Sequence, residues 1–240
     1  MNYVQVPAYG EVMPRDALTR DQIVRTAVDL LDADGLEGLN MRALGKRLDS
    51  AATAVYWHVK NKDNLVLLAT DRVWSELALP DLEAVDWRGA AVAMATDLYG
   101  MFTRHPWLVQ ALAAHVVYGD GKARHDDHFL AIFETAGFTP DQADRATGAV
   151  FTYVLGNAAG AAATASLARK LERADDSTTA EEQLQDVMSK AQEVARHYPR
   201  LCARLDSTAA TAYASAPDDT FAFGLDALLD GLGRRLAERP

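Results

Sequence analysis

The chain has 240 residues, of which 49% are hydrophobic, and a formal net charge of −10 at pH 7. This length is sufficient for a small domain and a larger one with its own core, and the negative charge excludes a protein that coats nucleic acid over its whole surface. The single cysteine, Cys202, excludes an intramolecular disulfide and fits a reducing cytoplasm. Residues 1–18 lack the features of a secretory signal or a transit peptide, so we expect a cytoplasmic protein.

Almost the whole chain is expected to be helical. Residues 19–34 show the apolar spacing of a half-buried helix, and Gly35 is expected to end it. No alternating run long enough for a strand is present, which predicts an all-α fold. We expect a flexible arm over 1–17, a turn at 118–122 and a mobile loop at 175–179. Further helices are expected over residues 41–48, 52–58, 62–79, 86–104, 107–117, 125–136, 140–173, 180–197 and 218–238.

Residues 40–62 are typical of a DNA-reading helix-turn-helix. Asn40 is expected to cap a short helix in which Leu44 and Leu48 face inward, and residues 49–51 form the break before a second, aromatic helix. The window contains five basic residues and one acidic residue, in contrast to the anionic remainder of the chain. Such a mixture favours contacts with phosphates and base edges. The alternative is an ordinary helical hairpin with solvated lysines.

A family resemblance follows from these residues. The segment 18–74, with YWHVKNK at 56–62, resembles the N-terminal domain of the TetR (tetracycline repressor) family, and FAFGLDALLDGL at 221–232 is similar to a dimerisation helix of that family. The resemblance implies a three-helix DNA-binding domain over 18–64 and a larger helical ligand-binding and dimerisation domain over 65–240. It further implies a homodimer that binds a palindromic DNA operator, usually as a repressor, and is released by a small molecule. Neither enzymatic activity nor a cofactor is implied.

The resemblance also assigns roles in DNA binding. It places Arg42 at a guanine-reading position and Thr53 against a thymine methyl group. Ala52 stands where a base-reading glutamine is found, so the operator is expected to differ and to be read more through methyl contacts or DNA shape. Asp49 replaces a glycine of the turn, and we expect a left-handed backbone there. The phosphate-contacting positions are Tyr56, His58 and Lys62, and Asn40, besides capping its helix, is a further candidate.

The body is expected to hold a small-molecule pocket. The polar drug contacts of the tetracycline repressor are not matched, because apolar Met94 and Leu98 stand at two of them. The metal-binding histidine of that repressor has no secure counterpart here, since His115 lies a few residues away from the aligned position. The resemblance therefore favours an apolar or aromatic effector over tetracycline with magnesium, and no metal site is assigned. The candidate ligand contacts are Met94, Leu98, Phe102, Trp107, His115, Tyr153 and Asn157, each of which also fits ordinary core packing.

The uncharged segment 146–168 has two interpretations. It is long enough to span a bilayer, but it is mainly Ala, Gly and Thr, which is too weakly apolar for stable insertion, so no membrane partner is expected. Its small residues instead allow close helix packing, and with helix 218–238 it could form a four-helix bundle across a twofold axis. The expected interface residues are Gly156, Gly160, Phe221, Leu225, Leu228, Leu229 and Leu232.

Two rival functions remain open from the sequence. His125 and His128, with Asp126 and Asp127 between them, are a plausible metal cluster and hence a metal-dependent hydrolase site, although a solvated N-terminal helical turn explains them more simply. A dimeric DNA-binding regulator without a ligand is the second rival. No Gly-rich phosphate loop or nucleophile–base constellation is present.

Overall fold

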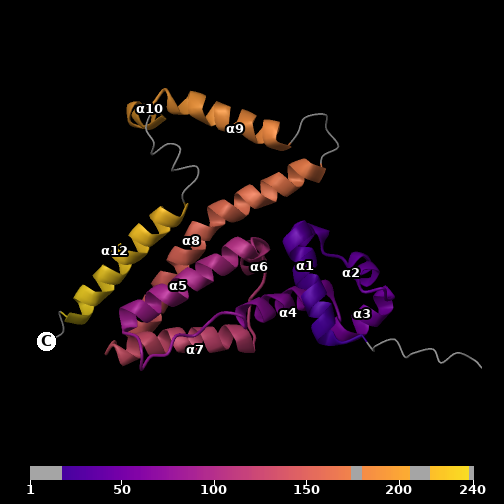
Figure 1. Ribbon diagram of the computed structural model, residues 1–240, viewed down its shortest axis with the longest axis horizontal. Coiled ribbons are helices and arrows are strands. Elements are labelled where there is room, and N and C mark those ends of the chain that lie inside the picture. Colours follow the sequence, from indigo (N-terminus) through magenta and orange to yellow (C-terminus); the bar gives the residue numbers. More distant parts are fainter. Residues whose placement is uncertain (1–17, 174–179, 206–216, 238–240) are drawn as a thin grey trace, which may run out of the picture.

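The structure is a computed structural model in which residues 18–173, 180–205 and 217–237 are described. Every regular element in those ranges is an α-helix (Figure 1), which confirms the all-α prediction. The predicted arm over 1–17 and loop over 175–179 lie outside the described residues. The helices are α1 (Arg20–Gly38), α2 (Met41–Arg47), α3 (Ala52–Val59), α4 (Lys62–Trp74), α5 (Trp87–Arg104), α6 (Trp107–Ala114), α7 (Asp120–Thr135), α8 (Pro140–Arg173), α9 (Ala180–Ala195), α10 (Pro199–Leu205) and α12 (Pro217–Ala237).

Two expected boundaries need correction, and one helix was not expected. Helix α4 ends at Trp74, and the guanidinium of Arg124 donates to the carbonyls of Ser75 and Leu77 that follow it, each at 3.0 Å. Helix α7 begins at Asp120, within the segment 118–122 where a turn was expected, and follows Gly119, whose φ is 156°. Helix α10 was not predicted, although a proline at its first position is a common start signal. The remaining boundaries agree within a few residues.

The three N-terminal helices form a small head around a tight turn. Helix α3 inserts Val55 and Val59, both fully buried, against the buried Leu44 of α2. Between the two helices the backbone amide of Ser50 donates to the carbonyl of Gly45, at 2.9 Å, and a Cβ at Gly45 would lie 2.7 Å from the carbonyl oxygen of Ser50. This close approach requires glycine. Asp49 has a φ of 46°, as expected for a left-handed turn residue.

Helix α1 is kinked at Gly35. The residue has a φ of 67°, so the regular helix breaks where the sequence predicted its end, but a further turn continues to Gly38. A side chain at this position would also approach Arg169 of α8, whose Nε lies 3.3 Å from the site of a Cβ. The kink is therefore a point at which the head and the body touch.

The body is a bundle in which α5, α7 and α8 lie against one another and α4 runs between them and the head (Figure 1). Large aromatic side chains fill its centre. Trp74 meets Phe102 edge to face, with 5.8 Å between ring centroids, and Tyr99 stacks on Phe221 of α12 at 4.3 Å. Helix α9 runs back along α8, on the side away from α5 and α7, and α10 follows it (Figure 1).

Helix α8 is the membrane candidate of the sequence. Its part Pro140–Arg169 is long enough and, with a mean hydropathy of 1.2, apolar enough to span a bilayer by composition alone. Its inner face packs in the bundle, where Val150 and Val154 are fully buried. Small and hydroxyl side chains make up much of its outer face, so the structure adds no support for a membrane span.

A buried tryptophan joins the head to the body. The indole Nε1 of Trp107, on α6, donates to the carboxylate of Asp32 on α1 at 2.7 Å. The Nδ1 of His105 lies 2.7 Å from the same oxygen. Because Trp107 is completely buried, this carboxylate satisfies a donor that has no access to water.

Candidate functional site

The outer face of α3 is the candidate nucleic-acid surface. Thr53, Tyr56 and His58 are exposed, whereas Ala52 is half-buried against the core of the head. The inward valines fix the orientation of the helix. The structure therefore brings three of the predicted contact residues to one accessible surface, and Ala52 offers at most the edge of a methyl group.

Helix α2 presents a second part of this surface. The side chain of Asn40 accepts from the backbone amide of Ala43 at 2.8 Å, which confirms the predicted cap. Arg42 follows it and is exposed, with no ion pair to any described residue. A guanidinium in this state is available for bidentate hydrogen bonds to a partner outside the chain.

Lys62 differs from the other predicted contacts, because the chain itself engages it. Its Nζ donates to the carbonyl oxygen of Leu36, beyond the kink of α1, at 2.7 Å. An ammonium group has three donors, so this bond leaves donors for a phosphate, but it also gives Lys62 a structural role that sequence reasoning missed.

Two further residues of the head were missed. Trp57 is 90% exposed and is the most exposed large hydrophobic side chain of the described residues. The sequence predicts an aromatic helix here, and the spacing of the buried Val55 and Val59 places Trp57 on its outward face. Lys60 ends α3 with a φ of 63°, an unusual conformation for a lysine that turns the chain sharply into α4.

The predicted ligand contacts do not meet in one cavity. Met94, Phe102 and Trp107 are buried core residues, and Trp107 is bonded to the head. Tyr153 donates to the carbonyl of Phe221 at 2.9 Å and therefore joins α8 to α12. The amide of Asn157 is bonded to the carbonyl of Tyr153, and His115 caps the end of α6. Of the seven predicted residues, only Leu98 lines the cavity of the body.

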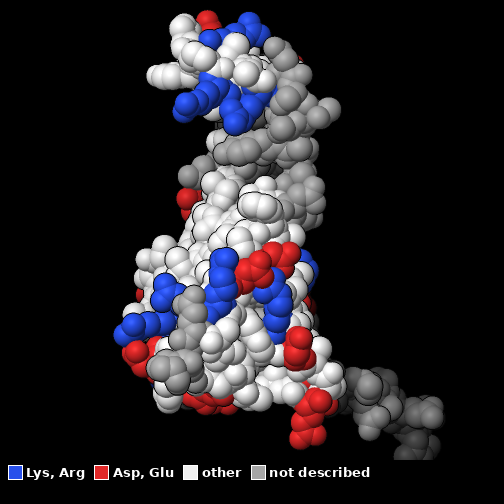
Figure 2. Space-filling model, turned by 90° about the vertical axis from the view of Figure 1, so that its left-hand side faces the viewer, with Lys and Arg blue, Asp and Glu red and all other residues white. Residues whose placement is uncertain are grey.

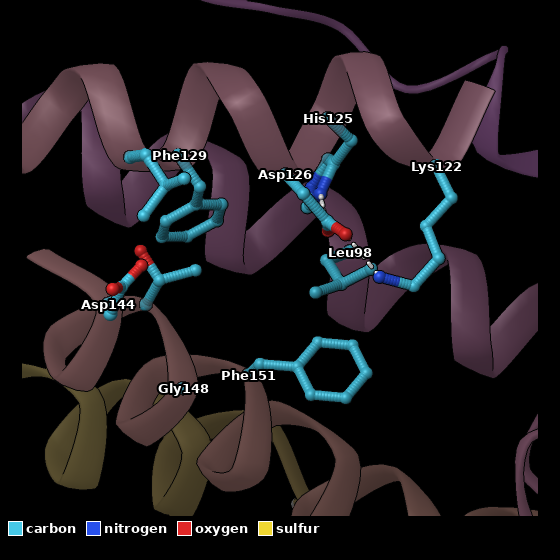
Figure 3. Close-up of a pocket in the computed structure, with 10 residues that line it drawn as sticks. Leu98, Lys122, His125, Asp126, Phe129, Asp144, Gly148 and Phe151 are labelled. Atoms are coloured by element: carbon cyan, nitrogen blue, oxygen red, sulfur yellow. Dashed lines mark hydrogen bonds and ion pairs between the residues drawn. The ribbon is translucent and has the colours of Figure 1, made fainter. Parts of the chain in front are cut away.

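That cavity lies between α5, α7 and α8 and has a volume of about 280 Å³ (Figure 3). Its walls combine apolar and aromatic side chains with a few polar groups, the composition typical of small-molecule sites. The signal that could have found it is the pair His125 and Phe129, four residues apart on one face of α7. The lining residues are Leu98, Lys122, His125, Asp126, Phe129, Leu130, Asp144, Thr147, Gly148 and Phe151.

The histidine cluster of α7 does not converge. His125 is buried and lines the cavity, whereas the Nε2 of His128 lies 2.8 Å from the carbonyl oxygen of Pro80 on another side of the helix. Among the described residues, no group of three or more His, Cys, Asp or Glu side chains is placed to hold a metal ion. The expected solvated N-terminal turn also needs correction, because α7 begins five residues earlier and buries His125.

A small electrostatic network lines one end of the cavity. The Nζ of Lys122 is paired with the carboxylate of Asp126 and lies over the ring of Phe151, 5.7 Å from its centroid. The Nδ1 of His125 is 3.7 Å from Asp126, too far for a hydrogen bond. Burial raises the pKa of Asp126, but the neighbouring His125 and Lys122 together lower it by more than burial raises it. The pKa therefore lies below its ordinary value of 3.8.

The predicted dimer residues of α12 are redistributed by the structure. Phe221, Leu225 and Leu229 are buried within the chain itself, where Phe221 stacks on Tyr99 of α5 and Tyr153 of α8, so they leave little surface for the predicted dimer interface. Leu228 and Leu232 are partly buried, and the exposed large side chain of this helix is Phe223, at 79%. On α8, a Cβ added at Gly156 or Gly160 would meet no described atom within 4 Å.

A small helical head with a locally basic helix-turn-helix and an outward-facing third helix, joined to a larger helical body, defines the class of helix-turn-helix transcriptional regulators. Family models agree: residues 23–69 match the bacterial regulatory proteins of the tetR family, and residues 79–236 match the tetracyclin repressor-like C-terminal domain. The chain belongs to the TetR family of DNA-binding transcriptional regulators, which are not enzymes.

Individual relatives support this placement. The chain is 32% identical over 229 residues to the transcriptional repressor DrrR1 of Streptomyces coeruleorubidus, covering 94% of this chain and 81% of that protein. It is 36% identical over 140 residues to a transcriptional regulator of Saccharopolyspora erythraea, covering 58% of this chain and 59% of that protein. Among solved structures, ActR of Streptomyces coelicolor in complex with actinorhodin shares the fold, with a TM-score of 0.71, 24% identity and coverage of 91% and 96%.

Proposed function

We propose that this chain is a cytoplasmic repressor that binds a palindromic operator as a homodimer and is released by a small aromatic molecule. The observation that supports DNA reading most directly is the outer face of α2 and α3, where Arg42, Thr53, Tyr56 and Trp57 are exposed above a fully buried inner face. Such a helix enters the major groove with its side chains directed at base edges and phosphates.

The homodimer is supported by the outer surface of α8 and α12. Figure 2 views the molecule from the side that bears α12 and shows a band of uncharged side chains above a cluster of Lys, Arg, Asp and Glu side chains. On these helices Phe223 is exposed, and Gly156 and Gly160 of α8 have open space beside them. A large exposed aromatic side chain beside small residues suits close packing of helices from a second copy.

The effector is proposed to occupy the cavity between α5, α7 and α8. Its signal has a short path to the head, because the first turn of α7 is bonded to α4. The backbone amide of Lys122 donates to Asp71 at 3.1 Å, and a Cβ at Gly121 would lie 2.4 Å from the carbonyl oxygen of Asp71. A ligand that displaces Lys122 therefore moves α4, which begins beside the DNA-reading surface, and this alters the spacing of the two recognition helices.

The DNA-binding proposal is tested by selecting bound duplexes from a random pool at low ionic strength. We expect enrichment of a palindrome whose half-sites are about 34–36 Å apart, or a multiple of that spacing. Thr53→Asp should abolish binding by placing a negative charge on α3, whereas Ala123→Asp adds the same charge to an exposed site on α7 and should bind normally. If the unaltered chain prefers no duplex over scrambled competitor, the proposal fails.

The effector proposal is tested by measuring the affinity of a cavity-binding compound for the free protein and for its DNA complex. An inducer must bind the free protein more tightly, because it can shift the equilibrium only by its differential affinity. Equal affinity for both forms would leave a regulator whose DNA binding is independent of that ligand.

A further inference from the structure

Two polar groups in the cavity wall have no hydrogen-bond partner in the described chain. Both ring nitrogens of His125 and the hydroxyl of Thr147 are buried and unpaired. His125 is 3% exposed and points from α7 into the space between α7 and α8 (Figure 3). Buried polar groups are normally satisfied, and leaving one unpaired costs free energy. A neutral imidazole and a hydroxyl each donate and accept, so together they suit a ligand with a hydroxyl or carbonyl group.

The remaining walls limit the shape of that ligand. Phe129 and Phe151 face the cavity from α7 and α8, and Leu98 lines it from α5 (Figure 3). Aromatic rings pack favourably against such side chains. An apolar cavity of ~150 Å³ holds one benzene ring, so a volume of about 280 Å³ corresponds to roughly two rings.

The charges of the lining set its polarity. The one lysine, Lys122, is neutralised by its pair with Asp126 and covers the ring of Phe151. A second carboxylate, Asp144, lies at the opposite end of the cavity (Figure 3), is exposed, and forms no ion pair with any residue the structure describes. The unbalanced charge of the site is therefore negative, which attracts a cation and repels an anion.

We infer that the effector is a small aromatic compound that carries an alkylammonium group and a hydroxyl or carbonyl oxygen. The oxygen bonds to His125 and Thr147, the rings lie between Phe129 and Phe151, and the ammonium group faces Asp144. This inference rests on the proposed effector role of the cavity and adds the chemical class of the ligand.

The test uses the full chain and three hydroxynaphthalenes that differ in one substituent, which is aminomethyl, methyl or carboxylate. Calorimetric titration should rank the aminomethyl compound first and the carboxylate last, at least about tenfold apart. Asp144→Asn should remove the preference for the amine and leave the methyl compound unchanged. Asp127→Asn, which alters an exposed carboxylate of α7 outside the cavity, should change nothing. His125→Phe should weaken the binding of the methyl-substituted hydroxynaphthalene. The loss in affinity should be about tenfold greater than for methylnaphthalene, which lacks the hydroxyl group.

The inference is overturned if the carboxylate binds as tightly as the amine, if Asp144→Asn preserves the ranking, or if no probe binds. These outcomes are separable from the proposed function, because DNA selection is measured without a ligand. A chain that selects an operator but rejects the amine refutes the ligand class alone. If the chain binds the amine but selects no duplex, the proposed function as a DNA-binding regulator is refuted.

Discussion

At the residue scale, the side chains of the DNA-reading surface differ in how firmly the chain holds them. Arg42 has no ion pair among the described residues, whereas Lys62 is already bonded to the carbonyl of Leu36. A free guanidinium is suited to reading a base, and a lysine that also ties α4 to α1 links the fold to phosphate contact. Substitutions at these two positions therefore report on different properties.

We predict that Arg42→Ala weakens operator binding by about 1–3 kcal/mol and relaxes the preference at one base position, because a bidentate base contact is lost. Binding assays on the operator and on single-base variants measure both effects. Lys46→Ala, on the exposed side of the same helix, is a cleaner control than Lys62→Ala and should affect all duplexes alike. Equal losses on operator and random DNA for Arg42→Ala would exclude base reading.

The carboxylate of Asp126 gives a prediction about pH. Its folded-state pKa is lowered below 3.8, so the folded protein favours the ionised form, and the resulting stability is present above 3.8 and is lost as the pH falls through the folded pKa. Since the side chain is 42% exposed, solvent screening limits the contribution to at most about 1 kcal/mol. Asp126→Asn should therefore lower the free energy of unfolding at neutral pH and have no effect in strong acid.

Urea denaturation at neutral pH and in strong acid measures the difference in free energy of unfolding between Asp126→Asn and the unaltered chain. Asp127→Asn, one residue along and exposed, serves as the control and should match the unaltered chain throughout. A deficit of Asp126→Asn that persists unchanged in acid would assign its effect to packing rather than to charge.

At the scale of elements, two carboxylates join helices that are far apart in the sequence. Asp32 of α1 accepts from Trp107, and Asp71 of α4 accepts from the backbone amide of Lys122 at the start of α7. Each carboxylate satisfies a donor on a different helix. The relative placement of the helices therefore depends on a few side chains as well as on apolar packing.

For the first contact we predict that Asp32→Ala lowers the free energy of unfolding by about 1–3 kcal/mol, because the buried Nε1 of Trp107 loses its acceptor. Asp32→Asn keeps an oxygen in place and should lose less. Thermal or urea denaturation, followed by tryptophan fluorescence, gives both values. Equal stability of the alanine variant and the unaltered chain would show that another group replaces the carboxylate.

For the second contact we predict that Asp71→Ala costs about 0.5–2 kcal/mol, the usual effect of removing a helix cap. Its more specific effect is on coupling: a compound bound in the cavity should release DNA less effectively from the variant while binding with nearly unchanged affinity. Titration of the compound against the free and the DNA-bound variant measures this. Undiminished release would show that the signal reaches α4 by another route.

At the scale of the whole molecule, the division of charge separates the surfaces. Lys and Arg are concentrated in the head between residues 40 and 62, whereas the chain as a whole is anionic. The body therefore repels DNA and confines binding to one surface. The exposed Phe223 of α12 and the small side chains of α8 fit a second copy of the chain, and the exposed Asp226 and Asp230 of α12 are paired with Arg88 of the same chain.

We predict that Phe223→Asp dissociates the dimer, with at least a tenfold weaker self-association or about 1.4 kcal/mol, since it puts a charge on an exposed apolar side chain of α12. Sedimentation velocity over a range of concentrations measures the change. Val116→Asp alters another exposed apolar residue, outside α8 and α12, and should remain dimeric. An unaltered chain that sediments as a monomer would remove the basis of the dimer proposal.

The sequence by itself determined the helical class, the helix-turn-helix and its cap. These features depend on residues close together in the chain: the spacing of Leu44 and Leu48, the amide of Asn40, and Asp49 in the turn. Local periodicity and capping depend on residues only a few positions apart, so they can be predicted from the sequence without knowledge of the tertiary structure.

Only the tertiary structure decided which aromatic and polar side chains line a cavity and which fill the core. Trp107 and Tyr153 are residue types that often contact ligands. In this fold they have structural roles, because they form long-range hydrogen bonds to Asp32 and Phe221. His125 instead faces the cavity, because it lies on the side of α7 that packs toward α5 and α8. Such roles depend on which helices meet, and this is set by packing between segments far apart in the chain.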